Sequence, residues 1–158
     1  MNTTTAAHID HSERNVGIDI GKSMLDVCIF ELDMYLQYPN TAEGIRELTK
    51  KLSRYKLTRI LVEATGGYER GLVEACAEKE LPLIIMQPTQ VRQFAKAQGI
   101  NAKTDKIDSR VIAQFGAVMK PEVRPLNSKK VRYIRDLLSR KRQLNEMRTQ
   151  ELNRQHKA

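Results

Sequence analysis

The sequence predicts an α/β fold, in which helices flank a sheet of about five strands of mixed direction and a long basic helix follows. Three observations support this fold class. Three short apolar strands come one after another near the N-terminus. Strand-like and helix-like segments then alternate. After residue 120 the pattern becomes helical and rich in Lys and Arg. A chain of 158 residues suits one ordinary domain with an appendage.

The first two predicted strands are Val16–Ile20 and Leu25–Phe30, joined by a tight turn at 21–23. Asp19 lies between two isoleucines of the first strand, where burying a carboxylate is costly unless it has a partner. Two interpretations stay open at this point. Asp19 either faces solvent or the amides of the turn, or it projects from the sheet as a ligand for a divalent metal. A third strand is predicted over Asp33–Pro39, where apolar residues alternate.

Strands and helices alternate in the next segment. Asn40 and Glu43 have the spacing of a capping box, which predicts the start of a helix there. The next apolar strand ends in a carboxylate, Glu63, and two glycines then mark a turn. The strand that ends at Glu63 is predicted over Arg59–Glu63, and a helix follows over Tyr68–Glu80. A further strand over Leu81–Gln87 and a short helix over Thr89–Gln98 complete this part.

A pair of aspartates opens the next predicted helix. Thr104 is a suitable N-cap, and apolar residues continue at helical spacing as far as Phe115. Asp105 and Asp108 are three residues apart, so both carboxylates would share one face of the first turn. The simpler alternative is that the helix dipole favours acidic residues at this end.

The C-terminal part is predicted to be a connector and a long helix. Two prolines within 120–127 exclude a regular helix, and Ser128 then caps a helix from Lys129 to about Gln155. This helix has too few apolar residues for a globular core, so it would pair as a coiled coil, pack on another domain or lie along nucleic acid. Its pattern is unfinished at the last residue, which suggests a fragment of a longer protein. The predicted organisation is a disordered tail (1–14), an α/β domain (15–119), a linker (120–127) and the basic helix (128–158).

The positive charge is concentrated in the C-terminal part. Residues 1–119 contain 15 Lys+Arg and 15 Asp+Glu, whereas residues 120–158 contain 12 and 4, so the net charge of +8 belongs to the second part. A basic segment beside a neutral domain favours a nucleic-acid partner, although a solvated charged helix is the alternative. The candidate nucleic-acid contacts are Lys22, Lys103, Lys129, Lys130, Arg132, Arg135, Arg140, Lys141 and Arg142. For Lys22 and Lys103 an ordinary surface role is the alternative.

Composition also excludes several classes of protein. No apolar run is long enough to span a membrane, and the N-terminal residues lack the apolar centre of a secretory signal. Cys28 and Cys76 have no metal-ligand spacing, so we expect reduced core cysteines in a cytoplasmic protein.

Four carboxylates stand at the positions where these elements would meet: Asp19, Glu63, Asp105 and Asp108. If the first and fourth strands are neighbours, Asp19 and Glu63 lie side by side, and a helix on that face brings the two aspartates to them. Four anions so close together repel one another unless cations neutralise them. Oxygen ligands suit Mg²⁺ or Mn²⁺, and two such ions support chemistry at a phosphodiester.

Three segments carry a resemblance to a known family. VGIDIGKSMLDV, VEATGGYE and NAKTDKIDSRVIA resemble the signature blocks of the DEDD transposases and DNA invertases of the Piv/MooV type, which are insertion-sequence recombinases. The resemblance covers residue 15 to the end. It implies a fold similar to the Holliday-junction-resolvase branch of the ribonuclease H superfamily. It also implies metal-dependent cleavage and transfer of DNA strands during transposition.

The resemblance further implies roles for particular residues and partners. Asp19, Glu63, Asp105 and Asp108 match the family's acidic tetrad, which coordinates divalent metal. The long helix matches a coiled-coil segment that takes part in dimerisation, so a homo-oligomer is expected. The implied partners are DNA, as transposon ends and target, and a structured guide RNA.

The chain departs from the family in one respect. Full members carry a second, C-terminal domain with a serine implicated in strand cleavage, and no serine here matches that motif. We therefore expect this fragment to be inactive in complete recombination.

Two alternative functions remain open. GIDIGKS also resembles the phosphate-binding hairpin of actin-like kinases, which would make the chain a phosphotransferase fragment. That class leaves Asp105, Asp108 and the basic helix unexplained. The other alternative is a non-catalytic module for RNA binding and dimerisation, in which the acidic residues serve only structure.

Overall fold

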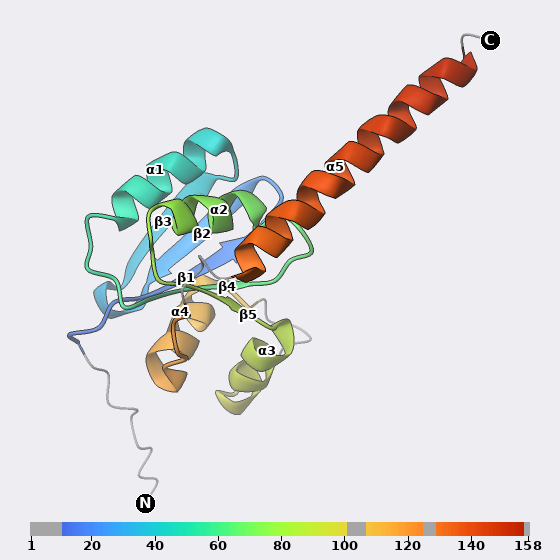
Figure 1. Ribbon diagram of the computed structural model, residues 1–158. Helices are drawn as coiled ribbons and strands as arrows, with labels where there is room; N and C mark the ends of the chain where they lie inside the picture. The colour runs from blue at the N-terminus through green and yellow to red at the C-terminus, as the bar shows by residue number, and fades with distance from the viewer. Residues whose placement is uncertain (1–10, 101–106, 125–128, 157–158) are drawn as a thin grey trace, which may run out of the picture. The chain divides into compact units, whose positions relative to one another are not determined.

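The computed structural model describes residues 11–100, 107–124 and 129–156 (Figure 1). Contacts divide the chain into two units, Met1–Arg124 and Pro125–Ala158. The first contains the strands β1 (Asn15–Ile20), β2 (Met24–Ile29), β3 (Met34–Pro39), β4 (Arg59–Glu63) and β5 (Leu83–Met86). Its helices are the 3₁₀ turn η1 (Phe30–Leu32) and α1 (Ala42–Leu52), α2 (Arg70–Glu78), α3 (Pro88–Ala97) and α4 (Ser109–Met119). The second unit contains α5 (Lys129–His156).

The five strands form one mixed sheet in the order β3-β2-β1-β4-β5. The first three are antiparallel neighbours, whereas β4 runs parallel to β1 and β5 parallel to β4. The predicted α/β fold class, a mixed sheet of five strands flanked by helices and followed by a long basic helix, is confirmed. The central position of β1 next to β4 is the arrangement that the proposed pairing of Asp19 with Glu63 requires.

Helices cover both faces of the sheet, with α1 and α2 on one side and α3 and α4 on the other (Figure 1). On the α3–α4 side, Leu61 and Met86 pack with Val91, Phe94, Ile112 and Phe115 in one buried cluster. The rings of Phe94 and Phe115 meet edge to face, with centroids 5.4 Å apart. Because both faces of the sheet are covered there, the central strands β1 and β4 read as nearly continuous buried runs, whereas β3 alternates.

Gly17 determines how closely α4 approaches the sheet. A Cβ added at Gly17 would lie 2.2 Å from the carbonyl oxygen of Ser109 and 2.4 Å from the amide nitrogen of Ala113. The backbone of α4 therefore lies directly against β1. Asp19 is two residues further along the strand and so on the same face, beside the N-terminus of α4.

The first residue of α1 differs from the expected one. Thr41, not Asn40, is the N-cap, and its hydroxyl accepts a hydrogen bond from the amide of Gly44 at 3.1 Å. The Asn40 amide instead donates to the carbonyls of Gly21 (2.8 Å) and Tyr68 (3.0 Å). The Asn40 side chain is therefore used in long-range contacts instead of capping the helix.

The helix expected to contain Asp108 in its first turn begins only at Ser109, directly after Asp108, so that expectation is wrong. Asp108 is the N-cap of α4, with an extended backbone, and its Oδ1 accepts a hydrogen bond from the amide of Val111 at 3.0 Å. This bond satisfies one of the amides that a helix start leaves without an intrahelical partner. Thr104 and Asp105 lie outside the described residues.

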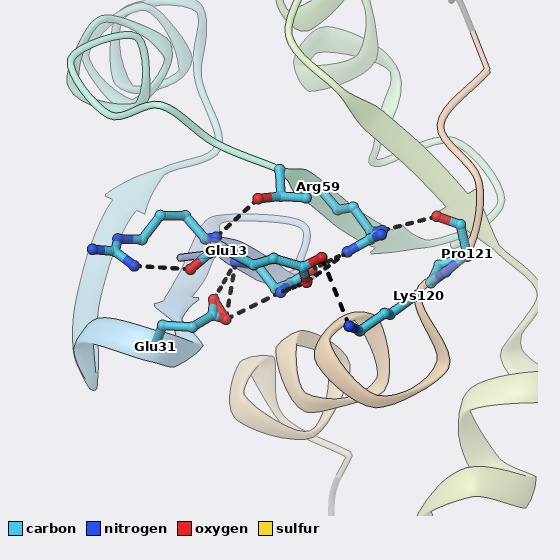
Figure 2. A network of polar contacts seen from close by, with 8 residues as sticks. Glu13, Glu31, Arg59, Lys120 and Pro121 are labelled. Atoms are coloured by element: carbon cyan, nitrogen blue, oxygen red, sulfur yellow. Dashed lines mark hydrogen bonds and ion pairs between the residues drawn. The ribbon is translucent and has the colours of Figure 1, made fainter. Parts of the chain in front are cut away.

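A polar network fixes the opposite end of β1 (Figure 2). The Arg59 guanidinium donates to the side-chain oxygen of Asn15 at 3.1 Å and to the carbonyl of Pro121 at 2.9 Å, and pairs with Glu13 at 3.0 Å. The Asn15 side chain is fully buried and donates to both Glu13 and Glu31. These contacts join β1, β4, η1 and the segment that follows α4, so α4 is anchored at its C-terminal end.

Cys28 and Cys76 are buried and unbonded to each other, as expected for core cysteines. Burial raises the pKa of Cys28 to about 11 and that of Cys76 to about 12. Within the described residues, no helix combines the length and the apolar character needed to cross a membrane.

Candidate carboxylate site

Two of the predicted carboxylates meet at the ends of two neighbouring parallel strands. The register pairs Ile18 of β1 with Val62 of β4, so the next residues along both strands are Asp19 and Glu63. Burial raises the pKa of Glu63, as does the negative charge of Asp19, while Arg92 acts in the opposite direction. The pairing predicted from the sequence is therefore present, and the two charges act on each other.

One oxygen of Glu63 is buried without a hydrogen-bond partner. Among the described residues, no other buried side-chain oxygen or nitrogen lacks a hydrogen-bond partner. Leaving such an acceptor unsatisfied costs free energy, and the cost is larger for a charged group. An unsatisfied carboxylate oxygen beside a second carboxylate is a suitable ligand set for a divalent cation. These residues therefore fit the metal that the sequence predicts.

A hollow of about 410 Å³ lies beside Asp19 on the side away from Glu63, toward β2 and β3. Its lining consists of Asp19, Asp26, Val27, Tyr35, Leu36, Gln37, Asp108 and Ser109. Asp19 and Asp108 thus line the same hollow, because α4 packs on this face of β1.

Asp26 is a carboxylate of this region that the sequence reasoning did not identify. The antiparallel register places it directly opposite Asp19, and Gln37 donates to its Oδ1 at 2.9 Å. The available signal was the hairpin itself, because a turn centred between positions 22 and 23 brings 19 and 26 together. Arg92 was likewise not identified from the sequence, although its charge acts on Glu63.

The complete tetrad stays a prediction. Within residues 11–100, 107–124 and 129–156, no group of three or more His, Cys, Asp or Glu side chains is arranged to hold a metal ion. Asp105, the fourth member, lies outside this part of the chain, as does Lys103. The described geometry therefore places Asp19 beside Glu63 along the sheet and, with Asp108, in the lining of one hollow.

The candidate nucleic-acid residues fall into three groups. Lys22 is exposed in the turn directly after β1. Arg140, Lys141 and Arg142 are exposed on α5. The backbone of α5 also includes Lys129, Lys130, Arg132 and Arg135, whose side chains lie outside what the structure describes.

Comparisons with known proteins agree with the resemblance found in the sequence. The chain is 29% identical over 116 residues to the pilin gene-inverting proteins of Moraxella lacunata and Moraxella bovis. These alignments cover 70% of this chain and 36% of each relative, so the chain spans about a third of the length of the curated relatives it matches. Among solved structures, T. thermophilus RuvC in complex with Holliday junction substrate aligns with a TM-score of 0.46 and 16% identity, covering 68% of this chain and 96% of that one.

A family model extends over nearly the whole sequence. It is described as a transposase of the DEDD type, and it matches residues 16–158, which include both strand-end carboxylates, α4 and all of α5. The chain belongs to the DEDD transposase family.

Proposed function

We propose that the chain is the N-terminal catalytic part of a transposase or site-specific DNA recombinase that cleaves and transfers DNA strands with a divalent metal. Membership of the DEDD transposase family supports this proposal. The single observation that carries it is the unsatisfied, buried Oε1 of Glu63 beside Asp19. A bound cation would offset the cost of burying this carboxylate oxygen at a strand end without a hydrogen-bond donor.

Asp19 and Glu63 are the residues that would hold Mg²⁺ or Mn²⁺, with Asp108 and Asp105 completing the tetrad. Mg²⁺ sites commonly use one or two protein carboxylates and fill the remaining positions with water and substrate phosphates. A pair at two strand ends is therefore sufficient for a first binding site. A bound divalent ion would neutralise the carboxylates and stabilise negative charge on the phosphodiester oxygens.

The partner in this proposal is DNA, both as transposon ends and as target. The exposed Arg140, Lys141 and Arg142 of α5 would contact phosphates and release their counterions. Leu137, Leu144, Met147 and Leu152 are exposed apolar residues on the same helix, which supports self-association through α5. A guide RNA is a further partner suggested by the family resemblance. Since the alignment covers 36% of the relatives, we propose that complete recombination needs residues beyond this alignment.

The test is a thermal-unfolding titration of the 158-residue chain with Mn²⁺. We expect the melting temperature of the wild type to rise with Mn²⁺, because the ion binds only the folded state. Glu63→Gln and Asp19→Asn remove one ligand charge each and should abolish the rise. Glu47→Gln, an exposed change on α1, is the matched control and should keep it. Equal rises in all four proteins would contradict the proposed metal site.

A second measurement connects the metal to DNA. Anisotropy of a labelled DNA fragment should show tighter binding in Mn²⁺ than in chelator for the wild type, because the ion joins the carboxylates to a phosphate. Glu63→Gln should lose this dependence and keep the metal-independent part of its affinity. If Mn²⁺ changes DNA affinity equally in both proteins, the carboxylates do not act on DNA. The non-catalytic alternative would then be favoured.

A further inference from the structure

A second hollow, of about 600 Å³, lies at the surface beside α1 and α2. Its lining includes Lys22, Asn40, Arg46, Gly67, Tyr68 and Arg70. Lys22 follows the end of β1, and Gly67 and Tyr68 follow the end of β4. We call this hollow the edge groove, because residues that follow the ends of β1 and β4 form part of its lining.

Four cations line the edge groove, and three of them come from three separate elements near the strand ends. Lys22 comes from the turn after β1, Arg46 from the first part of α1, and Arg70 from the start of α2. The Arg70 guanidinium is held by Glu74, one turn later, with Nε and Oε1 3.4 Å apart. Glu78 and Lys79, which also line the groove, lie at the other end of α2. Toward the strand ends the groove carries Lys22, Arg46 and Arg70 against Glu74, so this end is positive on balance.

An aromatic ring stands exposed at this positive end. Tyr68 is 49% exposed, and the two glycines before it have open space around them, because an added Cβ at either would meet nothing within 4 Å. Asn40 donates to the carbonyls of Tyr68 and Gly21 and so ties this loop to the turn that carries Lys22. The Tyr68 backbone is therefore held in place although its ring is exposed.

A second set of hydrogen bonds fixes the loop from inside. Glu69 Oε2 accepts hydrogen bonds from the amides of Thr65 (3.3 Å) and Gly67 (3.1 Å) and from the Thr65 hydroxyl. These hydrogen bonds lower the pKa of Glu69 despite its partial burial, so the carboxylate stays charged and keeps the loop closed at neutral pH. The loop that carries Tyr68 is thus held in one conformation before any ligand binds. Less conformational entropy is then lost on binding.

We propose that the edge groove binds an unpaired nucleotide of a phosphodiester strand, with the base stacked on Tyr68 and the phosphates at Lys22, Arg46 and Arg70. The volume suits one nucleotide. An exposed aromatic ring beside cations is the combination that recognises single strands, because only unpaired bases offer their faces for stacking. This inference rests on the proposed function, in which a nucleic-acid strand reaches the carboxylates near the same ends of β1 and β4.

The test compares three ligands of equal length: single-stranded oligothymidine, single-stranded oligouridine and a DNA duplex. Fluorescence anisotropy would be measured for the wild type, Tyr68→Ala, Tyr68→Phe and Arg46→Gln. We expect Tyr68→Ala to weaken single-strand binding roughly 5- to 100-fold, the range for losing one base–aromatic stack. Duplex binding should change by less than about twofold, since no base face is available to the ring. Tyr68→Phe should behave as the wild type, because the ring is kept.

Arg46→Gln tests the phosphate contacts separately. It should weaken single-strand binding and lower the slope of log affinity against log salt by about 1. The larger loss of affinity in Tyr68→Ala identifies the nucleic acid that the groove binds. A larger loss for oligothymidine indicates DNA, and a larger loss for oligouridine indicates RNA.

Unchanged single-strand affinity in Tyr68→Ala would overturn the inference, as would an equal loss for the duplex. Equal melting temperatures of Tyr68→Ala and wild type would exclude a folding defect. The Mn²⁺ titration of Glu63→Gln separates the two claims. A normal Mn²⁺ effect with no Tyr68 effect would reject the edge groove alone, and the reverse result would reject the metal site alone.

Discussion

At the scale of single residues, Glu63 carries an energetic cost in the metal-free protein. Its pKa is raised, first by burial and then by Asp19, so the charged form destabilises the fold. A raised pKa means that the stability associated with this group is fully present at acidic pH and is lost as the pH rises through the folded-state value. At neutral pH the charged Glu63 beside Asp19 therefore lowers the stability of the fold, and a bound cation would offset this loss.

This cost predicts that Glu63→Gln raises the melting temperature at pH 7 in the presence of chelator, by roughly 2 °C or more for a chain of this size. The gain should shrink as the pH falls through the raised pKa of Glu63 and be lost below the ordinary glutamate value of 4.5, because the wild-type carboxyl is then protonated in both the folded and the unfolded state. Scanning calorimetry from about pH 3.5 to about pH 8 covers both effects. A lower melting temperature for the variant at pH 7 would show that the charged form is already compensated.

Glu69 shows the opposite behaviour. Its lowered pKa means that its contribution to stability is present above the ordinary value of 4.5 and is lost as the pH falls below it. We expect Glu69→Gln to lower the free energy of unfolding at pH 7 by about 1–2 kcal/mol, because a partly exposed amide replaces a charged acceptor of three hydrogen bonds. Urea unfolding at pH 7 and at about pH 3.5 measures this, and an equal loss at both pH values would contradict it.

Single residues were the least predictable part of the site. The adjacency of Asp19 and Glu63 followed from their places at the ends of two apolar strands. By contrast, the side chain of Asn40 is taken up by long-range hydrogen bonds that a local pattern does not encode, and Thr41 caps α1 instead. Asp108 caps α4 through a local bond from the Val111 amide, at a position that the predicted helix start at Thr104 had placed inside the first turn. Asp26 became visible only through the hairpin register.

At the scale of elements, the site depends on the direct contact of α4 with β1. Gly17 permits that contact, and the backbone atoms of Ser109 and Ala113 occupy the space that a side chain would need. The sequence predicted both elements but not how closely they pack, because a glycine inside an apolar strand reads equally well as a simple weak point. The approach of α4 in turn places Asp108 near Asp19.

Gly17→Ala should therefore displace α4 and destabilise the fold by about 2 kcal/mol or more, as overpacking against backbone does. Gly71→Ala is the matched control. Its added Cβ would meet only the end of the Ile45 side chain, at 2.9 Å, and alanine is the better helix former. Chemical denaturation of both variants measures the difference. Equal stabilities would show that α4 does not need the close approach.

At the scale of the whole chain, the charge is divided between a neutral α/β unit and a basic helix. Composition alone predicted this division, because it depends only on counts along the sequence. It predicts that the salt dependence of DNA binding comes mainly from α5, where Arg140, Lys141 and Arg142 are exposed.

Replacing these three residues by Gln should lower the slope of log affinity against log salt by between about 1 and 3, or about 1 for each phosphate that the protein no longer neutralises. The matched control replaces Lys50, Arg54 and Lys56, near the end of α1, and changes the net charge equally. Binding of one DNA duplex at several salt concentrations measures the slopes. Equal slopes for the two triple variants would mean that net charge, rather than α5, governs the affinity.

The central claim is that the carboxylates at the ends of β1 and β4 hold a divalent cation. The most direct measurement is a crystal structure of the chain grown with Mn²⁺, with anomalous scattering used to locate the ion. The account predicts an anomalous peak in bonding contact with Oε1 of Glu63 and with Asp19. An absent peak at that position in crystals grown with excess Mn²⁺, or a peak bound only by Asp26 and Asp108, would contradict it.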